Sequence, residues 1–415
     1  MGVGRFVYTP VLPLMQTQAG LSASAGAHLA TANYVGYLGG ALAGTLIPGL
    51  VRSPAALRAS LVALTGSLAA MPVTHGTTVW LGLRLVAGVA SALVFVIAVT
   101  SVLGLLRGHP AHLPGWAFGG VGAGIAASGL LVLGLSPVAD WRAVWWASAA
   151  LTALLAGAAW RLRLELPATP ASTASTASTA PAVPVTLPVS AVSAVSAASA
   201  ASVAEGAGRP TTTRRRRRWF AVLLASYTLE GTGYIVAGTF LVAAVAQTSP
   251  GWVGSGAWVL VGLAAVPSAA LWTRLGRRRP LHDLLLAALV VQAVGIALPA
   301  LVSGVAAALL SAVLFGATFI GISTLALATG AWLQVHRSVG LLTAGYSVGQ
   351  ILGPLAVTPL LRDGYRPALL LAAAVVLTSA AAAAALRVGL RHPTAATRTR
   401  RRPTPRQPAT NQGDA

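Results

Sequence analysis

Long apolar stretches alternate with short polar breaks along most of the chain, and this pattern predicts membrane-spanning helices. A helix rises about 1.5 Å per residue, so about 20 apolar residues cross a hydrocarbon core about 30 Å thick. Twelve stretches fit, six on each side of a long interruption. They cover residues 2–16, 27–50, 57–73, 78–106, 113–135, 142–160, 219–245, 252–272, 282–302, 304–331, 339–360 and 366–386. The first is short for a span, so either the first helix is truncated at its N-terminus, with the true start upstream, or it is a tilted helix in a locally thinned bilayer; we favour the truncation.

The interruption divides the chain into four predicted regions. They are an N-terminal six-helix half (1–164), a cytoplasmic low-complexity basic linker (165–218), a C-terminal six-helix half (219–387) and a basic cytoplasmic tail (388–415). The linker is rich in Ser, Ala, Thr and Pro and cannot bury enough apolar surface to fold. Its five closing arginines either attract anionic lipid or anchor the following span, and we favour the anchor.

Short matches at a nearly constant offset indicate that the two halves are parallel repeats. Gly2, Gly4 and Arg5 match Gly231, Gly233 and Tyr234 at an offset of 229, as Gly120 and Gly124 match Gly349 and Gly353. Arg84-x-x-x-Gly88 matches Ala312-x-x-x-Gly316 at an offset of 228. Repeats of six spans surround a central path with a binding site near the midplane. The expected fold is therefore an all-α membrane protein of two six-helix repeats.

Composition supports a membrane protein and excludes several functions. The chain is 56% hydrophobic and only 8% charged, with a mean hydropathy of +0.76, which a soluble surface does not tolerate. Its net charge of +21 comes from 28 arginines, and 23 of these fall on one side if both termini are cytoplasmic. The charge thus indicates orientation in the lipid bilayer rather than a nucleic-acid partner. Without cysteine or clustered histidine, we expect no metal site and no cofactor.

Glu230 is the only one of the seven acids that lies in the interior of a predicted span, since Asp283 is the second residue of the span 282–302. A carboxylate at mid-bilayer costs about 2.5–3.5 kcal/mol, so it needs a partner, a proton or water. The repeat aligns Arg5 with Tyr234, one turn beyond Glu230, so facing halves would bring Arg5 and Glu230 to similar depth. A pair that separates and reforms would bind and release a proton; the alternative is a static ion pair. Arg84, inside the fourth span, is a further candidate for proton coupling or a structural cation.

Polar side chains on several spans predict a substrate cavity. Tyr227, Glu230 and Tyr234 share one helical face at spacings of three and four, and Asn33 and Tyr37 share another. Each residue alone is typical of a helix–helix hydrogen bond, but together they favour a wet cavity. The predicted cavity set is Tyr8, Asn33, Tyr37, Tyr227, Tyr234, Tyr346 and Gln350.

Several motifs resemble the major facilitator superfamily. Thr273-Arg274-Leu275-Gly276-Arg277-Arg278 is similar to its D-R-x-G-R-R gating loop, with Thr in place of Asp. Arg84-x-x-x-Gly88 is similar to its span-four motif, which is associated with proton coupling. Most closely, GVGRFVYTPVLPLMQ, ATANYVGYLGGALAG, YTLEGTGYIVAGTFLVAAV and LLTAGYSVGQILGPLAVTPLL resemble the bacterial YbfB/YjiJ-type transporters.

The resemblance implies a twelve-helix, monomeric transporter of the bacterial inner membrane. We therefore expect secondary active transport of a small molecule with protons as the coupling ion, by alternating access. Arg5 slightly favours a small organic anion over a sugar or drug, since a guanidinium binds carboxylate or phosphate. The alternatives are sugar or drug efflux, and a non-transporting membrane sensor or scaffold. No ATP-binding or catalytic motif is present, so an enzyme is not expected.

Overall fold

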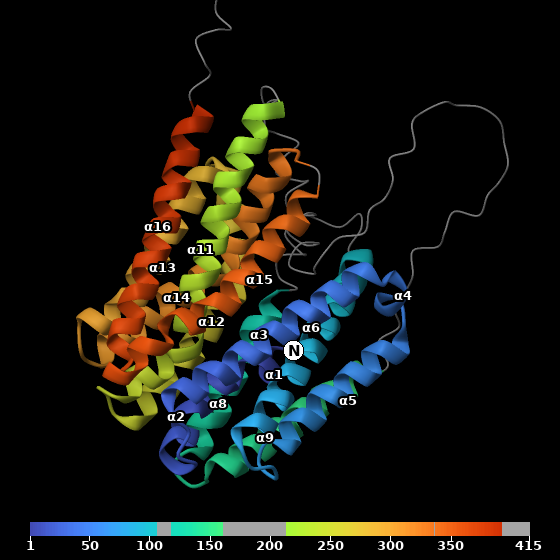
Figure 1. Cartoon of the computed structure of the whole chain (residues 1–415), viewed down its shortest axis with the longest axis vertical. Coiled ribbons are helices and arrows are strands. Elements are labelled where there is room, and N and C mark those ends of the chain that lie inside the picture. Colours follow the sequence, from blue (N-terminus) through green and yellow to red (C-terminus); the bar gives the residue numbers. More distant parts are fainter. Residues whose placement is uncertain (106–117, 161–212, 336, 392–415) are drawn as a thin grey trace, which may run out of the picture.

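A computed structural model of the protein describes residues 1–105, 118–160, 213–335 and 337–391. Every regular element in these residues is a helix, as predicted, and the helices form two groups (Figure 1). The N-terminal group consists of α1 (Gly2–Phe6), α2 (Tyr8–Gln18), α3 (Ala23–Leu46), α4 (Pro48–Val51), α5 (Pro54–Ala70), α6 (Thr77–Leu105), α8 (Gly119–Leu135) and α9 (Trp141–Ala159). The C-terminal group consists of α11 (Thr213–Ala246), α12 (Gly251–Gly276), α13 (Leu281–Leu301), α14 (Val305–Trp332), α15 (Ser338–Val357), the 3₁₀ helix η1 (Thr358–Asp363) and α16 (Tyr365–Arg391).

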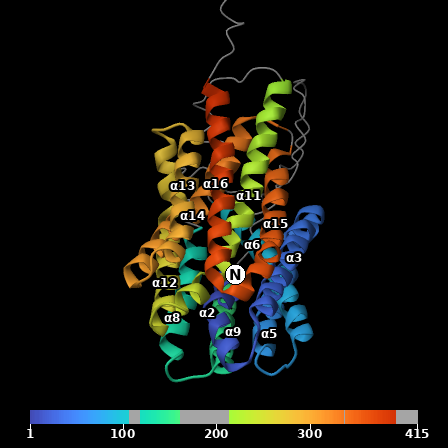
Figure 2. The same ribbon diagram turned by 60° about the vertical axis from the view of Figure 1, so that its left-hand side comes forward.

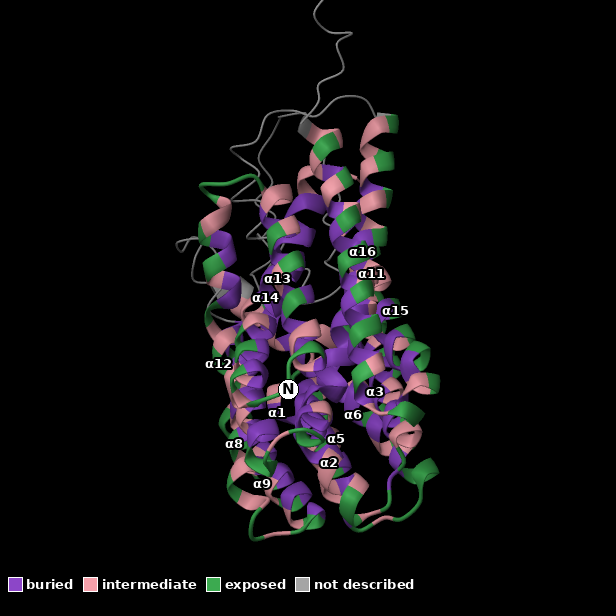
Figure 3. Cartoon of the chain, turned by 90° about the vertical axis from the view of Figure 1, so that its left-hand side faces the viewer, coloured by how far each residue is buried: buried purple, intermediate pink, exposed green. Residues whose placement is uncertain are grey.

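Eight helices of the described chain are long and apolar enough to cross a membrane. Two further apolar helices, α5 and α8, are shorter. A multi-pass membrane protein is thus confirmed, whereas the count of twelve spans stays a prediction. Large apolar side chains such as Leu46, Val62 and Leu154 are exposed, as a surface in contact with lipid requires. Buried positions lie where helices face one another (Figure 3).

Two predicted boundaries differ from the structure. The first predicted span, 2–16, is divided into α1 and α2 at Val7. Pro10 explains the division, because its ring clashes with the carbonyl of Phe6 four residues earlier. The predicted linker ended at residue 218, but α11 begins at Thr213, so its five arginines are helical. The rest of the linker up to residue 212, and the tail from residue 392, lie outside the described residues.

Within each group, glycines bring helix backbones into contact. Helix α3 packs along α6, where a Cβ atom on Gly36 would lie 2.1 Å from the carbonyl oxygen of Leu85. A Cβ on Gly88 would likewise lie 2.1 Å from the carbonyl oxygen of Asn33. Helix α11 packs along α15, where a Cβ on Gly349 would lie 2.3 Å from the oxygen of Thr228. Lipid tails are as apolar as the helices, so the hydrophobic effect does not drive the helices together in a membrane. Dispersion contacts, which such close approach strengthens, contribute to their association instead.

The two groups meet along α8 with α12 and along α3 with α15 (Figure 2). The first contact is nearly backbone to backbone, because a Cβ on Gly262 would lie 2.2 Å from the amide nitrogen of Ala126. Near the end of α2, the Gln16 amide donates to the Tyr365 hydroxyl and joins the groups there. In the view of Figure 1 the groups diverge from this end toward α4 and the start of α11.

We predict that Gly262→Ala destabilises the fold, because the new methyl group overlaps the backbone of α8. Overpacking of this kind costs about 1–3 kcal/mol, which lowers the melting temperature in detergent. The matched control is Gly134→Ala on α8, where a Cβ meets nothing within 4 Å. This control is expected to keep or raise stability, since Ala is the better helix former. Equal melting temperatures for the two variants would contradict the close contact.

Candidate functional site

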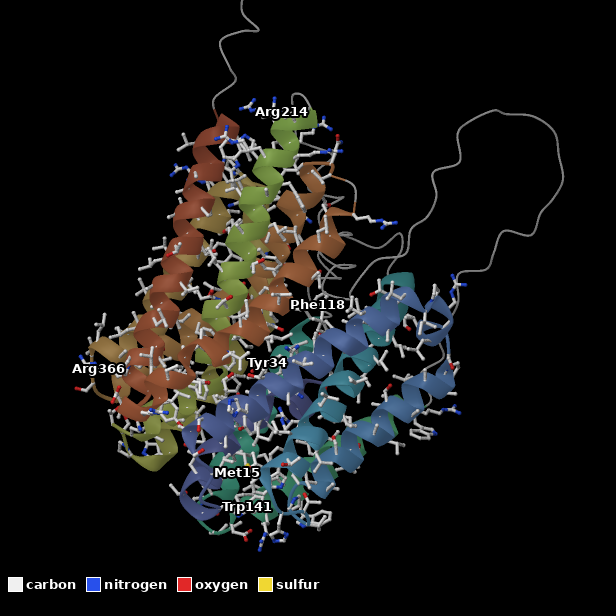
Figure 4. All side chains as sticks on the ribbon, in the orientation of Figure 1. Met15, Tyr34, Phe118, Trp141, Arg214 and Arg366 are labelled. Carbon is white, nitrogen blue, oxygen red and sulfur yellow. The ribbon has the colours of Figure 1, made fainter. Side chains whose placement is uncertain are left out.

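A cavity lies between the two groups and is walled mainly by aromatic rings. About 70 Å³ of it is open to the centres of water-sized molecules. Among the described residues that line it, Arg5 is the only one with a charged side chain. Figure 4 shows Tyr34 and Phe118 in the region where the two groups meet. The lining residues are Met1, Arg5, Phe6, Tyr37, Phe95, Phe118, Val121, Tyr227, Tyr234, Phe319, Ile320, Ser323, Thr343, Tyr346, Ser347 and Gln350.

The C-terminal group contributes a series of nearly parallel rings. Tyr346 of α15 stacks on Tyr227 of α11, with ring centroids 4.5 Å apart and planes inclined by 16°. Its other close neighbour is Tyr234, at 5.5 Å and 13°. Tyr234 in turn lies 5.1 Å from Phe319 of α14, at 18°. Tyr227 and Tyr234 therefore occupy one wall together, whereas Glu230, predicted on the same helical face, does not line the cavity.

Arg5 is buried and held by neutral partners from both groups. Its guanidinium lies 3.8 Å from the ring centroid of Tyr37, a short cation–π distance. Its Nη2 donates to the side-chain oxygen of Gln350 at 3.1 Å, and the Gln350 amide donates to the Tyr234 hydroxyl at 3.1 Å. The Arg5–Gln350–Tyr234 chain thus connects α1 with α15 and α11. The glycine at position 2 allows this placement, because α1 touches Gly124 of α8 there.

Arg84, Tyr8 and Asn33 lie behind this wall and not in the cavity lining. Arg84 donates to the carbonyl oxygen of Arg5 at 3.4 Å, and its guanidinium lies 4.7 Å from the Tyr8 ring centroid. Asn33 donates to the Arg84 carbonyl oxygen at 2.9 Å, and the Tyr8 hydroxyl donates to the carbonyl oxygen of Gly26 at 2.8 Å. Within the described residues, Nε and Nη1 of Arg84 have no hydrogen-bond partner. These contacts fasten α1 and α3 to α6.

Glu230 is fully buried in the C-terminal group and does not line the cavity. Neither carboxyl oxygen has a hydrogen-bond partner in the part of the chain that the structure describes. The Gln292 amide of α13 approaches the carboxyl group without reaching hydrogen-bonding geometry. The expected ion pair between Arg5 and Glu230, both of them described residues, is not formed, because the Arg5 guanidinium bonds to Gln350 instead. The other acids of the described chain have ordinary places: Asp140 caps α9, Asp283 pairs with Arg387, and Asp363 is exposed.

The predicted gating loop lies at the end of α12, and none of its residues lines the cavity. Arg274 is in the last turn, Gly276 ends the helix, and Arg277 follows it. The side chains of Arg274, Arg277 and Arg278 are exposed. The backbone amide of Arg278 donates to the carbonyl oxygen of Leu275 at 2.9 Å, which closes the helix end. The gating role stays a prediction.

Sequence reasoning placed several of the polar lining residues and missed the phenylalanines as well as Ser323, Thr343 and Ser347. Five of the seven residues predicted to line it do so, namely Tyr37, Tyr227, Tyr234, Tyr346 and Gln350. The missed rings are Phe6, Phe95, Phe118 and Phe319. A phenylalanine on an apolar span carries no signal that separates a cavity wall from a packed or lipid-facing position. Nor do the described residues contain a cluster of three His, Cys, Asp or Glu that could hold a metal ion.

The fold resembles solved transporter structures at low sequence identity. One is a mutant of the nucleoside transporter NupG, with a TM-score of 0.60 and 13% identity over 93% of this chain and 97% of that one. Another is the human organic anion transporter MFSD10 (TETRAN), with a TM-score of 0.52 and 13% identity over 92% and 97% of the two chains. At such identity the likeness concerns the fold alone. No curated protein matches the chain by sequence.

A family profile matches two segments that together cover most of the chain, residues 1–192 and 176–384. The family is described as "Uncharacterised MFS-type transporter YbfB". This match agrees with the all-helical fold, the membrane-spanning helices and the cavity between the two groups. The chain is therefore a member of the YbfB-type family of MFS transporters.

Proposed function

We propose that this membrane transporter is a proton-coupled secondary transporter of a small organic anion that works by alternating access. The observation that carries the proposal is the cavity between the groups, which is aromatic and whose described lining contains one cationic side chain and no acid. A small polar anion would find a charge-assisted hydrogen-bond donor in Arg5. The fully buried carboxyl group of Glu230, which has no hydrogen-bond partner among the described residues, supplies a place for the proton.

The distribution of arginines supports a cytoplasmic placement of both termini. Arginines cluster at the start of α11 and the end of α12, and Arg337 precedes α15 at the same end. Within the described ranges, the arginines of the opposite end are Arg142, Arg362 and Arg366, and Figure 4 shows Arg214 and Arg366 at opposite ends of the C-terminal group. By the positive-inside rule the richer end faces the cytoplasm, in this proposal that of a bacterial inner membrane. The groups diverge toward that end in Figure 1, so the conformation would be the inward-facing one.

Matching contacts in the two groups support the six-helix repeat in this proposal. Helix α1 touches α8 through Gly2 and Gly124, and α11 touches α15 through Gly349 and Thr228. These are the helices that an offset of 229 pairs between the halves. Helix α3 packs along α6 as α12 packs along α14. Two rigid repeats rocking about the cavity would expose it alternately to each side.

Proton coupling would use Glu230 without Arg5 as a direct partner. A carboxyl group in an apolar interior carries its charge only where water or a cation compensates it. Glu230 lies on the helix that presents Tyr227 and Tyr234 to the cavity. Movement of α11 against α13 would admit water to Glu230 in one conformation and exclude it in the other. The proton would then be released in the first conformation and held in the second.

We predict that Glu230→Gln abolishes substrate accumulation driven by a proton gradient, because an amide cannot take up and release the proton. Exchange of labelled for unlabelled substrate should continue, since exchange needs no net proton movement. Both rates are measured in proteoliposomes, with Asp363→Asn as the control acid, which is exposed. Undiminished driven accumulation in Glu230→Gln would refute proton coupling through this residue. Substrate binding without any transport by the wild-type protein would favour a sensor.

We predict that Arg5→Ala weakens the binding of anionic substrates more than the binding of neutral ones. Loss of a hydrogen bond to a charged group costs about 1.5–3 kcal/mol, or roughly tenfold to hundredfold in apparent affinity. Concentration dependence of transport for matched anionic and neutral solutes measures the difference, with the exposed Arg362→Ala as control. Equal losses for both classes of solute would make Arg5 structural.

We predict that Arg84→Met leaves the melting temperature unchanged or raised while driven transport falls. Two of the guanidinium nitrogens are buried without a hydrogen-bond partner in the described chain, so an apolar side chain of similar length removes a desolvation penalty. Transport should fall if Arg84 holds the Arg5 segment in place for coupling. A large drop in melting temperature, with normal transport by the protein that remains folded, would assign Arg84 a structural role only.

A further inference from the structure

The cavity described above has a chemistry that narrows the substrate class within the proposed function, on which this inference rests. Eight of its lining residues are aromatic, and these are four of the seven phenylalanines and four of the seven tyrosines in the chain. The described lining includes none of the eleven tryptophans. The rings are thus gathered here, and most of the surface that the lining presents is apolar. A ligand that fits must offer mainly a flat apolar face.

The orientation of the rings favours a planar ligand over a puckered one. Tyr227, Tyr346, Tyr234 and Phe319 are inclined to their neighbours by only 13–18°. On the N-terminal side Phe6 meets Phe319 edge to face, at 79°. Within the series each ring covers the face of the next, so a flat ring entering the cavity would lay its face against their edges while its own edge meets the opposite wall. Offset stacks and edge-to-face contacts are the two arrangements that aromatic pairs prefer.

The charge of Arg5 has no anionic partner within the described residues. Its hydrogen-bonded acceptor is the neutral side-chain oxygen of Gln350, at 3.1 Å. Hydrogen bonds that involve an ionised group are roughly twice as strong as those between neutral groups, and a carboxylate can bind a guanidinium at two points. A ligand carboxylate in the cavity would therefore displace the Gln350 oxygen. Gln350 itself would keep its bond to Tyr234.

We propose that the cavity binds a planar aromatic carboxylate, whose carboxylate replaces the Gln350 oxygen on Arg5 while its ring lies edge-to-face against Tyr346, whose two faces are covered by Tyr227 and Tyr234. Occupation would break the Arg5–Gln350–Tyr234 chain, which joins α1 of one group to α15 and α11 of the other. Gln350 is then a specificity-determining residue, because its side-chain oxygen occupies the position on Arg5 that the substrate carboxylate takes when it binds. Binding would release one polar connection between the groups.

The test is equilibrium binding to the full chain in detergent, measured by isothermal titration calorimetry with three probes. Benzoate is planar and anionic, cyclohexanecarboxylate is anionic but puckered, and benzamide is planar but neutral. Benzoate should bind about threefold to tenfold more tightly than cyclohexanecarboxylate, the range expected of one aromatic contact. It should bind about tenfold to hundredfold more tightly than benzamide, as loss of a charged hydrogen bond predicts.

Two substitutions of Gln350 separate displacement from a merely structural role. Gln350→Glu places a carboxylate on Arg5 permanently and should abolish benzoate binding. Gln350→Leu keeps a similar volume but offers no acceptor, so benzoate should bind as tightly as in the wild type or more tightly. A structural Gln350 would instead make both variants lose benzoate alike, and that result would overturn the proposal.

The aromatic contact is tested by Tyr346→Leu, with the exposed Trp146→Leu as its control. Tyr346→Leu should reduce the preference for benzoate over cyclohexanecarboxylate to near unity, and Trp146→Leu should leave it unchanged. Equal affinity for the planar and puckered acids in the wild-type protein, or no benzoate binding by folded protein, would overturn the substrate class. The measurement needs no transport, so proton-driven accumulation of another solute would still support the proposed function when this inference fails.

Discussion

The constraint on which this structure depends is that a polar group inside the bilayer needs a partner within the protein. Arg5 finds the Tyr37 ring and the Gln350 amide, and Arg84 finds a backbone carbonyl and the Tyr8 ring. These neutral partners orient two buried cations without neutralising them. Glu230 has fewer polar partners, because Gln292 is the one polar side chain of the described residues that approaches its carboxyl group as a donor. The charges with the fewest compensating partners thus lie beside the cavity. There a substrate anion could pair with Arg5, and a proton could neutralise Glu230.

The contacts between the two groups of helices are of two kinds. Along α8 and α12 the backbones touch through small residues, as at Gly122 and Gly262. Elsewhere the groups share single hydrogen bonds, such as Tyr34 with Thr239 and Gln16 with Tyr365. A glycine-lined contact allows two backbones to tilt against each other without losing apposition, and single hydrogen bonds can be exchanged for water or other partners. This combination suits rocking better than a continuous polar interface would.

Sequence patterns indicated the helical class, the family and the tyrosines and glutamine of the cavity, because all of these depend on local chemistry. Hydropathy marks a span and a tyrosine on that span marks a polar position, so Tyr227, Tyr234 and Gln350 could be found. The partner of Arg5 could not, since the choice between Glu230 and Gln350 depends on how α11 and α15 are rotated about their axes. The phenylalanine wall and the division of the first helix at Val7 likewise follow from packing in three dimensions and from Pro10.

Alternating access coupled to a proton at Glu230 is tested most directly by distances between the groups. The chain contains no cysteine, so pairs of spin labels can be attached at introduced cysteines without background. One pair, at Ser22 and Arg362, reports the end near Gln16, and another, at Arg52 and Arg337, reports the opposite end; all four residues are exposed. A change of pH should shift the two distance distributions in opposite directions, and Glu230→Gln should abolish both shifts. Distances that do not respond to pH, that change in the same direction, or that still respond in Glu230→Gln would contradict the account.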